Sequence, residues 1–433
     1  MNYCIACRSK LPDRPLFVLE DAPASAQDIP DAEEVKQDQG VKLGLYQCAE
    51  CGLVQFDCTP VSYYRDVIRA GGFTTTMTGL RRSQYRHLIE TYHLEGKRFL
   101  EVGCGRGEFL KVLTEFPVQV YGMEHKADLV RIAQAEGLQV WQEFPETEKQ
   151  VFGGKTAGML PQSVIRQREE AEAQTEGPFD VFLSFNFLEH QPEPDVMLQA
   201  IRSNLAEDGM GLVTVPALEY ILEQGSYYEL IRDHIAYYSF ATLGELLTRN
   251  GFTVLEEEML NRDTISMIVR KNPDWAPENG KGVGAGQTAE SGEKAGTLLE
   301  TADGEGESSV ARILSAGYRQ VTREVNRLLE TLTARGKSLA VWGASHQGFT
   351  LTATTRLGSQ ARYIIDSAPF KQGRYAPASH LPIVAPEHFT QEPVDVILIV
   401  APGYTDEIAG SIRKRFTPCP QILTLRTDRI ERL

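Results

Sequence analysis

The sequence predicts an α/β protein in which a small N-terminal metal-binding module precedes two α/β domains. Three observations lead to this expectation. From residue 98 onward, strand-like and helix-like segments alternate, which is typical of a mostly parallel sheet covered by helices. An apolar strand runs into a glycine-rich loop twice, at residues 103–107 and 343–348. Two Cys-x-x-Cys pairs lie within the first 51 residues.

The length of 433 residues exceeds what one compact core normally organises, so several domains are expected. We place a zinc-binding module at 1–70, a central α/β domain at 71–271, a flexible linker at 272–307 and a C-terminal α/β domain at 308–433. The linker region is rich in Gly, Glu, Ala and Thr and lacks periodic apolar residues. Such a segment buries too little surface to offset its ordering entropy.

Composition and charge exclude several classes of protein. The hydrophobic fraction of 42% is ordinary for a globular protein, and no apolar run is long enough to predict a membrane span. The N-terminus has no basic stretch followed by an apolar one, so we expect a cytoplasmic location. A net charge of −15 argues against nucleic acid as a partner. A small-molecule acceptor is compatible with this charge, and nothing in the sequence indicates an oligomeric state.

The hydrophobic pattern predicts the elements of both α/β domains. Strands are expected at 98–102, 118–123, 139–142, 180–184, 211–215, 253–259, 264–270 and 338–342. Helices are expected at 80–92, 108–115, 127–135, 195–204, 241–250 and 309–335. A long polar connection spans 146–177 and contains a helical pattern at 162–173.

The two cysteine pairs predict a structural zinc site. Zinc in such sites takes four tetrahedral ligands, and each Cys-x-x-Cys turn presents two sulfurs to one ion. The expected ligands are Cys4, Cys7, Cys48 and Cys51. Two unrelated pairs of buried or redox-active cysteines are the alternative. Cys58 stands alone and is expected in the core.

The first glycine loop predicts a site for a nucleoside-containing cofactor. It reads Gly103-Cys104-Gly105-Arg106-Gly107 and lies between a strand and a helix, whose free N–H groups can face a ligand. Glu101 precedes the loop where a carboxylate can hold an ammonium group, and Glu124 ends the next strand where it can accept ribose hydroxyls. Together they resemble the class I methyltransferase signature. A structural turn or a nicotinamide-binding domain are the alternatives.

Further polar residues follow the strands of the central domain. Glu143 lies where that fold places a contact to adenine, although a solvated surface role is the equal alternative. Asn186 and His190 follow the strand at 180–184, and Asp233-His234 lies in an aromatic-rich segment before a helix. Because ligands of open α/β sheets bind outside the carboxyl ends of strands, we expect these residues to face the sulfonium or the acceptor.

These motifs in this order resemble the sugar C-methyltransferases, which act on deoxy-ketosugar nucleotides. The resemblance covers nearly the whole chain and is most specific near the C-terminus. There, residues 341–348 resemble the family's Gly-Ala-x-x-x-Gly loop, and residues 365–377 resemble its Asp-x-x-Pro-x-Lys segment. The resemblance implies a central class I methyltransferase domain with a Rossmann-like fold, a second Rossmann-like domain behind it, and S-adenosylmethionine and Zn²⁺ as cofactors.

The family resemblance also implies roles for individual residues. His234 corresponds to the family's general base. From their positions in the chain, we expect Asp233 to orient His234, and His190 and Asn186 to shape the acceptor side. A nucleotide-sugar acceptor is implied, gripped at its nucleotide or phosphate end by the C-terminal domain. The residues expected for that grip are Lys371, Gln372, Arg374 and Tyr375.

The chain departs from the family pattern at several places, among them Asp233, which replaces the glutamate of the active-site motif. Ile231 and Phe73 stand where the family has active-site tyrosines, and His346-Gln347 stands at the place of a lysine. These departures put the acceptor and the methylated carbon in doubt. We expect C-methylation of a nucleotide-linked ketosugar or a similar carbonyl compound, by α-proton removal and methyl transfer. An O- or N-methyltransferase, or a non-catalytic protein that binds the cofactor or a nucleotide sugar, are the alternatives.

Overall fold

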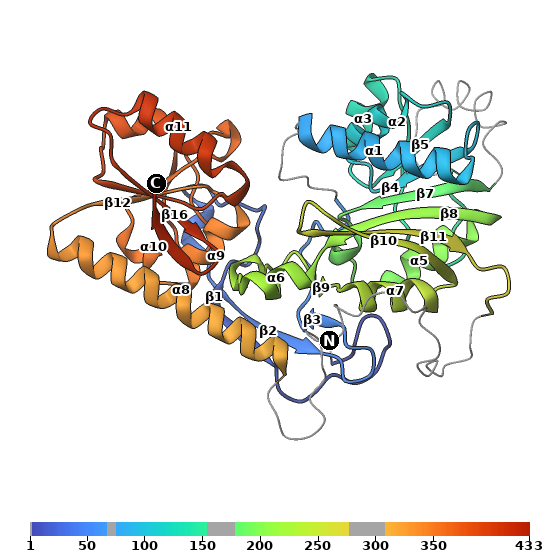
Figure 1. The fold of residues 1–433 in the computed structure, drawn as a ribbon, viewed down its shortest axis with the longest axis horizontal. Coiled ribbons are helices and arrows are strands. Elements are labelled where there is room, and N and C mark those ends of the chain that lie inside the picture. Colours follow the sequence, from blue (N-terminus) through green and yellow to red (C-terminus); the bar gives the residue numbers. More distant parts are fainter. Residues whose placement is uncertain (1, 67–74, 154–177, 277–307) are drawn as a thin grey trace.

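The computed structural model describes residues 2–66, 75–153, 178–276 and 308–433. The expected helix at 162–173, nearly all of the expected linker and Phe73 lie outside the described residues. Figure 1 shows two lobes, each built around its own sheet, with the N-terminal part of the chain between them. No helix among the described residues is long and apolar enough to cross a membrane.

The larger lobe holds a seven-stranded sheet in the order β10-β11-β8-β7-β4-β5-β6. Its strands are β4 (Arg98–Val102), β5 (Gln119–Glu124), β6 (Gln139–Gln142), β7 (Phe179–Phe185), β8 (Leu205–Pro216), β10 (Phe252–Leu260) and β11 (Thr264–Lys271). Five neighbouring strands are parallel, namely β8, β7, β4, β5 and β6. The strands β10 and β11 are antiparallel to their neighbours. The predicted mostly parallel sheet is therefore confirmed, with β8 beginning six residues earlier than expected.

Helices cover both faces of this sheet because successive strand residues point to opposite sides. On one face, Phe99 and Leu183 join a core formed with α1 and α2, whereas on the other, Leu100 and Phe182 pack with α5 and α7. The helices are α1 (Thr75–Tyr92), α2 (Glu108–Leu113), α3 (Ala127–Ala135), α5 (Pro194–Ser203) and α7 (Phe240–Arg249). Figure 1 shows α1, α2 and α3 on one side of the strands and α5 and α7 on the other.

The N-terminal part forms a four-stranded sheet in the order β1-β2-β3-β9. Three strands come from the beginning of the chain, β1 (Phe17–Ala22), β2 (Val41–Gln47) and β3 (Val54–Phe56). The fourth, β9 (Ala236–Tyr237), comes from the central part and pairs antiparallel with β3. The N-terminal sheet is thus completed by residues about 180 positions later in the chain.

The smaller lobe holds a six-stranded sheet in the order β14-β13-β12-β15-β16-β17, in which only β17 is antiparallel. The strands are β12 (Leu339–Trp342), β13 (Ile364–Ile365), β14 (Ile383–Val384), β15 (Val396–Ile399), β16 (Gln421–Arg426) and β17 (Arg429–Arg432). Its helices are α8 (Ser309–Ala334), α9 (His346–Thr354), α10 (Leu357–Gln360) and α11 (Thr405–Arg415). The core under α8 and α9 and the core under α11 lie on opposite faces.

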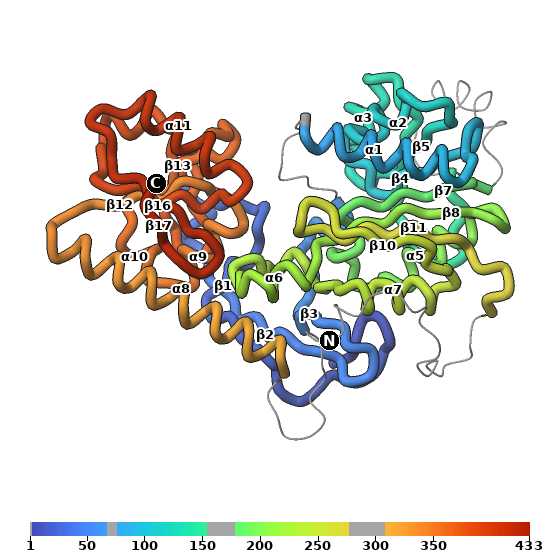
Figure 2. Tube along the Cα trace, viewed as in Figure 1, coloured from blue at the N-terminus to red at the C-terminus, as the bar shows by residue number. Residues whose placement is uncertain are grey.

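The two lobes touch where α8 crosses the end of α6 (Leu218–Gln224). Gly317 of α8 lies against Gly225, and a Cβ atom at 317 would overlap the carbonyl oxygen of Gly225. Helix and turn can approach this closely only because residue 317 carries no side chain. At its start α8 also meets the N-terminal sheet, because the Ser308 hydroxyl donates to the Gln47 side chain over 2.8 Å. The tube in Figure 2 shows α8 reaching from the smaller lobe to β2.

Candidate active site

The four predicted zinc ligands lie together in the N-terminal part. The Sγ atoms of Cys4 and Cys51 are 3.5 Å apart, those of Cys7 and Cys48 are 3.4 Å apart, and all four lie within 4.8 Å of one another. Tetrahedral zinc–thiolate bonds place sulfurs roughly 3.8 Å apart, so this geometry fits one Zn²⁺ ion. The buried side chain of Gln55 on β3 accepts a hydrogen bond from the backbone N–H of Ile5. This bond connects the turn that carries Cys4 and Cys7 to β3.

The glycine loop follows β4 at the carboxyl edge of the central sheet. Gly103, Gly105 and Gly107 all have positive φ, from 60° to 80°. A Cβ atom at 107 would overlap the Leu138 side chain, so both the backbone and the packing require glycine there. The Cys104 side chain is fully buried in the core with Leu110 and Val140. Only the backbone of Cys104 is therefore available to a cofactor.

Two buried carboxylates flank this loop. Glu101 on β4 and Glu124 at the end of β5 are both at most 1% exposed. The Glu124 carboxylate accepts the N–H groups of Gly105 and Lys126, each over 2.9 Å. Burial raises the pKa of Glu124, and these two hydrogen bonds counteract that rise. Two acidic groups beside three left-handed glycines suit a ligand with an ammonium group and a ribose.

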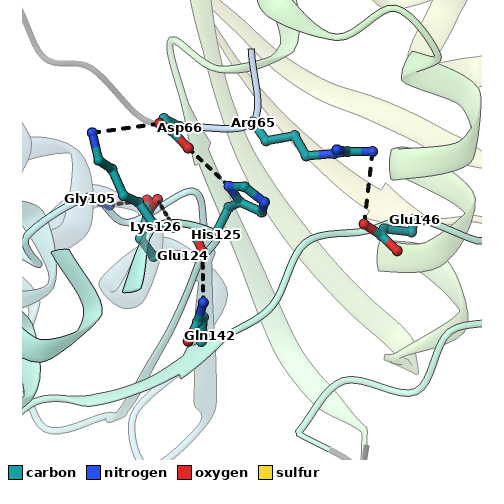
Figure 3. A network of polar contacts seen from close by, with 8 residues as sticks. All are labelled: Arg65, Asp66, Gly105, Glu124, His125, Lys126, Gln142 and Glu146. Atoms are coloured by element: carbon teal, nitrogen blue, oxygen red, sulfur yellow. Dashed lines mark hydrogen bonds and ion pairs between the residues drawn. The ribbon is translucent and has the colours of Figure 1, made fainter. Parts of the chain in front are cut away.

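A polar network lies beyond Glu124, as Figure 3 shows. Asp66, from the segment after β3, contacts His125 over 2.9 Å and Lys126 over 3.7 Å. In the same segment Arg65 lies 3.8 Å from Glu146, and its guanidinium stands over the Phe144 ring. These contacts connect the N-terminal segment to the carboxyl ends of β5, which neighbours β4, and of β6 at the edge of the sheet.

Glu143, the expected adenine contact, is half-buried and follows β6. One of its carboxylate oxygens accepts the backbone N–H of Gly153 over 3.2 Å, so it also holds the next loop. The adenine contact stays a prediction. Asn186 has a φ of +49° after β7, and its side-chain oxygen accepts the hydroxyl of Thr214 on β8 over 3.0 Å. It is exposed at the carboxyl edge of the sheet.

His190 and His234 meet in space although 44 residues separate them. His190 belongs to a short 3-10 helix, Leu188–His190, and His234 precedes β9. Their ring centroids are 4.8 Å apart at an interplanar angle of 81°. His234 is half-buried, and its imidazole makes no hydrogen bond to any residue in the described ranges. Burial, reinforced by His190 and His346, lowers the pKa of His234 well below 6.5.

Asp233 does not hold His234 as the sequence predicted. Its two carboxylate oxygens accept the Tyr63 hydroxyl over 2.6 Å and the Ala26 N–H over 2.9 Å. Its backbone carbonyl lies 2.8 Å from Nδ1 of His190. Because the side chain of Asp233 is turned toward the N-terminal part, it supports the neighbouring His190 and anchors the turn that carries His234.

Glu189 is a further acidic group beside these histidines. It is 2% exposed, and Oε2 has no hydrogen-bond partner among the described residues. Its Oε1 lies 3.9 Å from Nε2 of His190. Burial raises the pKa of Glu189 to about 8, so the neutral acid is its main form at pH 7.

The smaller lobe contributes to this region through α9. Glu229 of the larger lobe contacts Nε2 of His346 over 3.0 Å and accepts the Gln347 side chain over 2.6 Å. Sequence reasoning missed Glu229, because no local pattern indicates a contact between residues 117 positions apart. A cavity of about 350 Å³ adjoins Glu229 and is also lined by Tyr220, Tyr228, Tyr404, Thr405 and Arg426.

The residues expected to grip the acceptor make contacts within the chain. Nζ of Lys371 donates to the carbonyl of Ala344 in the second glycine loop over 2.7 Å. Arg374 donates to the carbonyl of Ile29 over 2.7 Å. The Gln372 side chain and the Tyr375 backbone also donate to carbonyl groups of the chain. Their contact with an acceptor stays a prediction.

Two regions of the chain match known protein families. Residues 77–257 match a family model described as a methyltransferase domain, and residues 295–417 match one described as a C-methyltransferase C-terminal domain. The C-methyltransferase NovU of Streptomyces niveus is 24% identical over 315 residues, which cover 72% of this chain and 68% of that protein.

Other similar proteins match smaller parts of the chain. The ubiquinone biosynthesis O-methyltransferase of Xanthomonas oryzae pv. oryzae is 30% identical over 27% of this chain and 41% of its own length. The magnesium protoporphyrin IX methyltransferase of Synechocystis PCC 6803 with bound SAM is a similar solved structure. It has 14% identity and a TM-score of 0.31, and the match covers 48% of this chain and 88% of that one.

With the seven-stranded sheet and its glycine loop, the family matches define the class of this protein. It is an S-adenosylmethionine-dependent methyltransferase. Within that class it carries the C-terminal domain of the C-methyltransferases, which forms most of the smaller lobe.

Proposed function

We propose that this enzyme methylates carbon in a nucleotide-linked ketosugar or a similar carbonyl compound. The observation that carries the proposal is the His234 imidazole, half-buried beside His190 with no hydrogen-bond partner among the described residues. A neutral imidazole of this kind can accept a proton. The C-methyltransferase C-terminal domain and the similarity to NovU support carbon as the methylated atom.

In the proposed reaction His234 removes a proton from the carbon next to the carbonyl group. The C–H electron pair becomes part of an enolate, whose carbon then takes the methyl group. S-adenosylmethionine supplies that methyl group as an electrophile and leaves as S-adenosylhomocysteine. General-base catalysis of this kind typically accelerates a reaction by roughly 10²–10⁴-fold. The neutral acid form of Glu189 next to His190 supplies a proton donor on the same side of the site.

We assign the cofactor to the glycine loop, with Glu101 near its amino group and Glu124 on its ribose. Zinc at the four cysteines has a structural role in this proposal, because four thiolates leave no open coordination position. The reaction steps above assign no role to that zinc ion.

For the acceptor's nucleotide end we favour the cavity beside Glu229. It opens near the carboxyl ends of β15 and β16, where open α/β sheets bind ligands. Tyr220 and Tyr404 offer rings for a base, and Arg426 offers a cation for phosphate. Lys371 and Arg374, expected for this role, are less available because carbonyl groups of the chain already engage them.

The test uses the full-length protein with S-adenosylmethionine and a panel of nucleoside diphosphate ketosugars. The expected product is about 14 Da heavier and carries a new C–CH₃ group by NMR, with equimolar S-adenosylhomocysteine. Without S-adenosylmethionine, the α-proton should exchange with solvent deuterium, and His234→Ala should slow this exchange by roughly 10²-fold or more. His87→Ala, an exposed histidine on α1, serves as the control.

The alternatives give different results in the same assay. A methyl group on oxygen would support an O-methyltransferase, the activity in the names of the ubiquinone biosynthesis relatives, and one on nitrogen would support an N-methyltransferase. If no acceptor yields S-adenosylhomocysteine while the cofactor binds, a non-catalytic binding role is favoured. If His234→Ala exchanges the α-proton at the wild-type rate, His234 is not the base.

A further inference from the structure

The Tyr63 hydroxyl lies between two segments that are far apart in sequence. It is 2.6 Å from Ser25 Oγ and donates to Asp233 Oδ1 over 2.6 Å. The N–H of Gln27 also points to it over 3.3 Å. Burial, reinforced by the Asp233 carboxylate, raises the pKa of Tyr63 well above 10, so the phenol remains a neutral donor.

Asp233 transmits this contact to the active site. Its carboxylate is 3% exposed and is held on both oxygens by the N-terminal part, through Tyr63 and the N–H of Ala26. Its carbonyl oxygen can only accept, so the proton between it and His190 must lie on Nδ1. In a neutral ring this leaves the lone pair on Nε2. The position of one peptide group therefore fixes the tautomer of His190.

The same turn is braced at two other points. At its beginning, the Tyr237 hydroxyl contacts both the N–H and the carbonyl of Ile231, over 2.8 and 3.1 Å. Arg232 donates to the carbonyls of Ala24 and Thr59. Because these contacts do not involve Tyr63, we expect the turn to stay docked when Tyr63 is changed. A change at Tyr63 should then act on the Asp233 peptide rather than on the fold.

We propose that Tyr63, a residue of the N-terminal part, is a positioning residue for the methyl-transfer site. It holds Asp233 so that the Asp233 carbonyl fixes His190 in the Nδ1–H tautomer, with its ring against His234. The catalytic consequence rests on the proposed role of His234, whereas the effect on the His190 tautomer does not. The N-terminal part thereby contributes to the reaction as well as carrying the cysteine cluster.

The test compares Tyr63→Phe with Tyr64→Phe. The two tyrosines are adjacent in the chain, and each substitution removes a single hydroxyl group. Tyr64 is the matched control, because its ring packs on Phe144 while its hydroxyl makes no hydrogen bond to a described residue. Histidine-ring ¹H–¹⁵N spectra of the full-length protein report the tautomers of its eight histidines, and His190→Gln assigns the His190 signal. In Tyr63→Phe this signal should lose its Nδ1–H pattern, and in Tyr64→Phe it should keep it.

Kinetics supply the second measurement, with a nucleoside diphosphate ketosugar that the wild type methylates. Tyr63→Phe should lower kcat by roughly ten- to hundredfold, since small displacements of reacting groups cost this much. The calorimetric Kd for S-adenosylhomocysteine should stay within about twofold of wild type. Ser25→Ala, which leaves the Tyr63 ring in place, should move kcat in the same direction by a smaller factor.

The outcomes separate this inference from the proposed function. A wild-type His190 signal in Tyr63→Phe overturns the inference, and so does an equal loss of kcat in Tyr64→Phe. If Tyr63→Phe fails to fold, Ser25→Ala with an unchanged His190 signal and unchanged kcat has the same effect. If wild-type protein methylates no ketosugar, the proposed function fails, while the spectra still decide whether Tyr63 sets the His190 tautomer.

Discussion

The imidazole rings of His190 and His234 meet almost at right angles, with centroids 4.8 Å apart and an interplanar angle of 81°. Two imidazolium ions at this separation would repel each other, and the site is too buried for water to screen them fully. Burial lowers the pKa of His190, although the nearby Asp233 opposes this, and burial lowers the pKa of His234 further. The pair is therefore neutral at physiological pH, and at least one ring is ready to accept a proton.

This pair predicts how activity depends on pH. A base acts in its deprotonated form, and a pKa lowered from 6.5 keeps His234 in that form at lower pH than a free histidine. As the pH falls from 7, the profile of log(kcat/KM) should stay level to below 6.5, and its acid limb should begin only below the ordinary histidine value. An acid limb centred at 6.5 or higher would contradict the assignment of His234 as base.

Glu124 should be required for cofactor binding. Glu124→Gln keeps the size of the side chain but turns an N–H₂ group toward one of two backbone donors, Gly105 or Lys126. Cofactor affinity should fall by about 1–3 kcal/mol, because the ribose contact and the shape of the loop are both disturbed. Calorimetric titration with S-adenosylhomocysteine measures this. Glu136→Gln, an exposed partner of Lys111, is the control, and equal affinity in the two variants would refute the contact.

Metal removal should affect the N-terminal part selectively. Purified protein should contain about one zinc ion per chain, and Cys7→Ser should lower that content. Hydrogen exchange should then rise in residues 2–56 and in β9, which pairs with β3, while S-adenosylhomocysteine binding persists. Cys419→Ser, an exposed cysteine outside the cluster, serves as the control. Zinc-free protein with wild-type exchange rates would exclude a structural metal.

The crossing of α8 and α6 should be sensitive to a single methyl group. Gly317→Ala places a Cβ atom against the Gly225 carbonyl and should destabilise the protein by about 1–3 kcal/mol through overpacking. Gly410→Ala is the control in helix α11. A Cβ atom there would have no neighbour within 4 Å, so the change should be neutral or slightly stabilising. Thermal unfolding of both variants distinguishes them, and an unchanged Tm for Gly317→Ala would contradict the close contact.

Local sequence patterns predicted the elements better than their partners. The strands β4, β5 and β7 could be predicted to within one residue because buried parallel strands are almost continuously apolar. The clustering of the four cysteines in space could be predicted from their Cys-x-x-Cys spacing. The two-residue strand β9 could not, because no periodicity appears in so short a segment. The Asp233–Tyr63 contact could not be predicted either, because local patterns carry no information about contacts between residues 170 positions apart.

The pairing of β3 with β9 has a consequence for the order in which the chain can fold. During synthesis Val54 emerges 183 residues before its partner Tyr237. Until then β3 is an open edge, which is a common starting point for aggregation. A zinc ion bound by the cysteine cluster can join the segment before β1 to the turn between β2 and β3 before β9 is synthesised. We therefore expect zinc supply during translation to influence the yield of folded protein more than zinc added after folding.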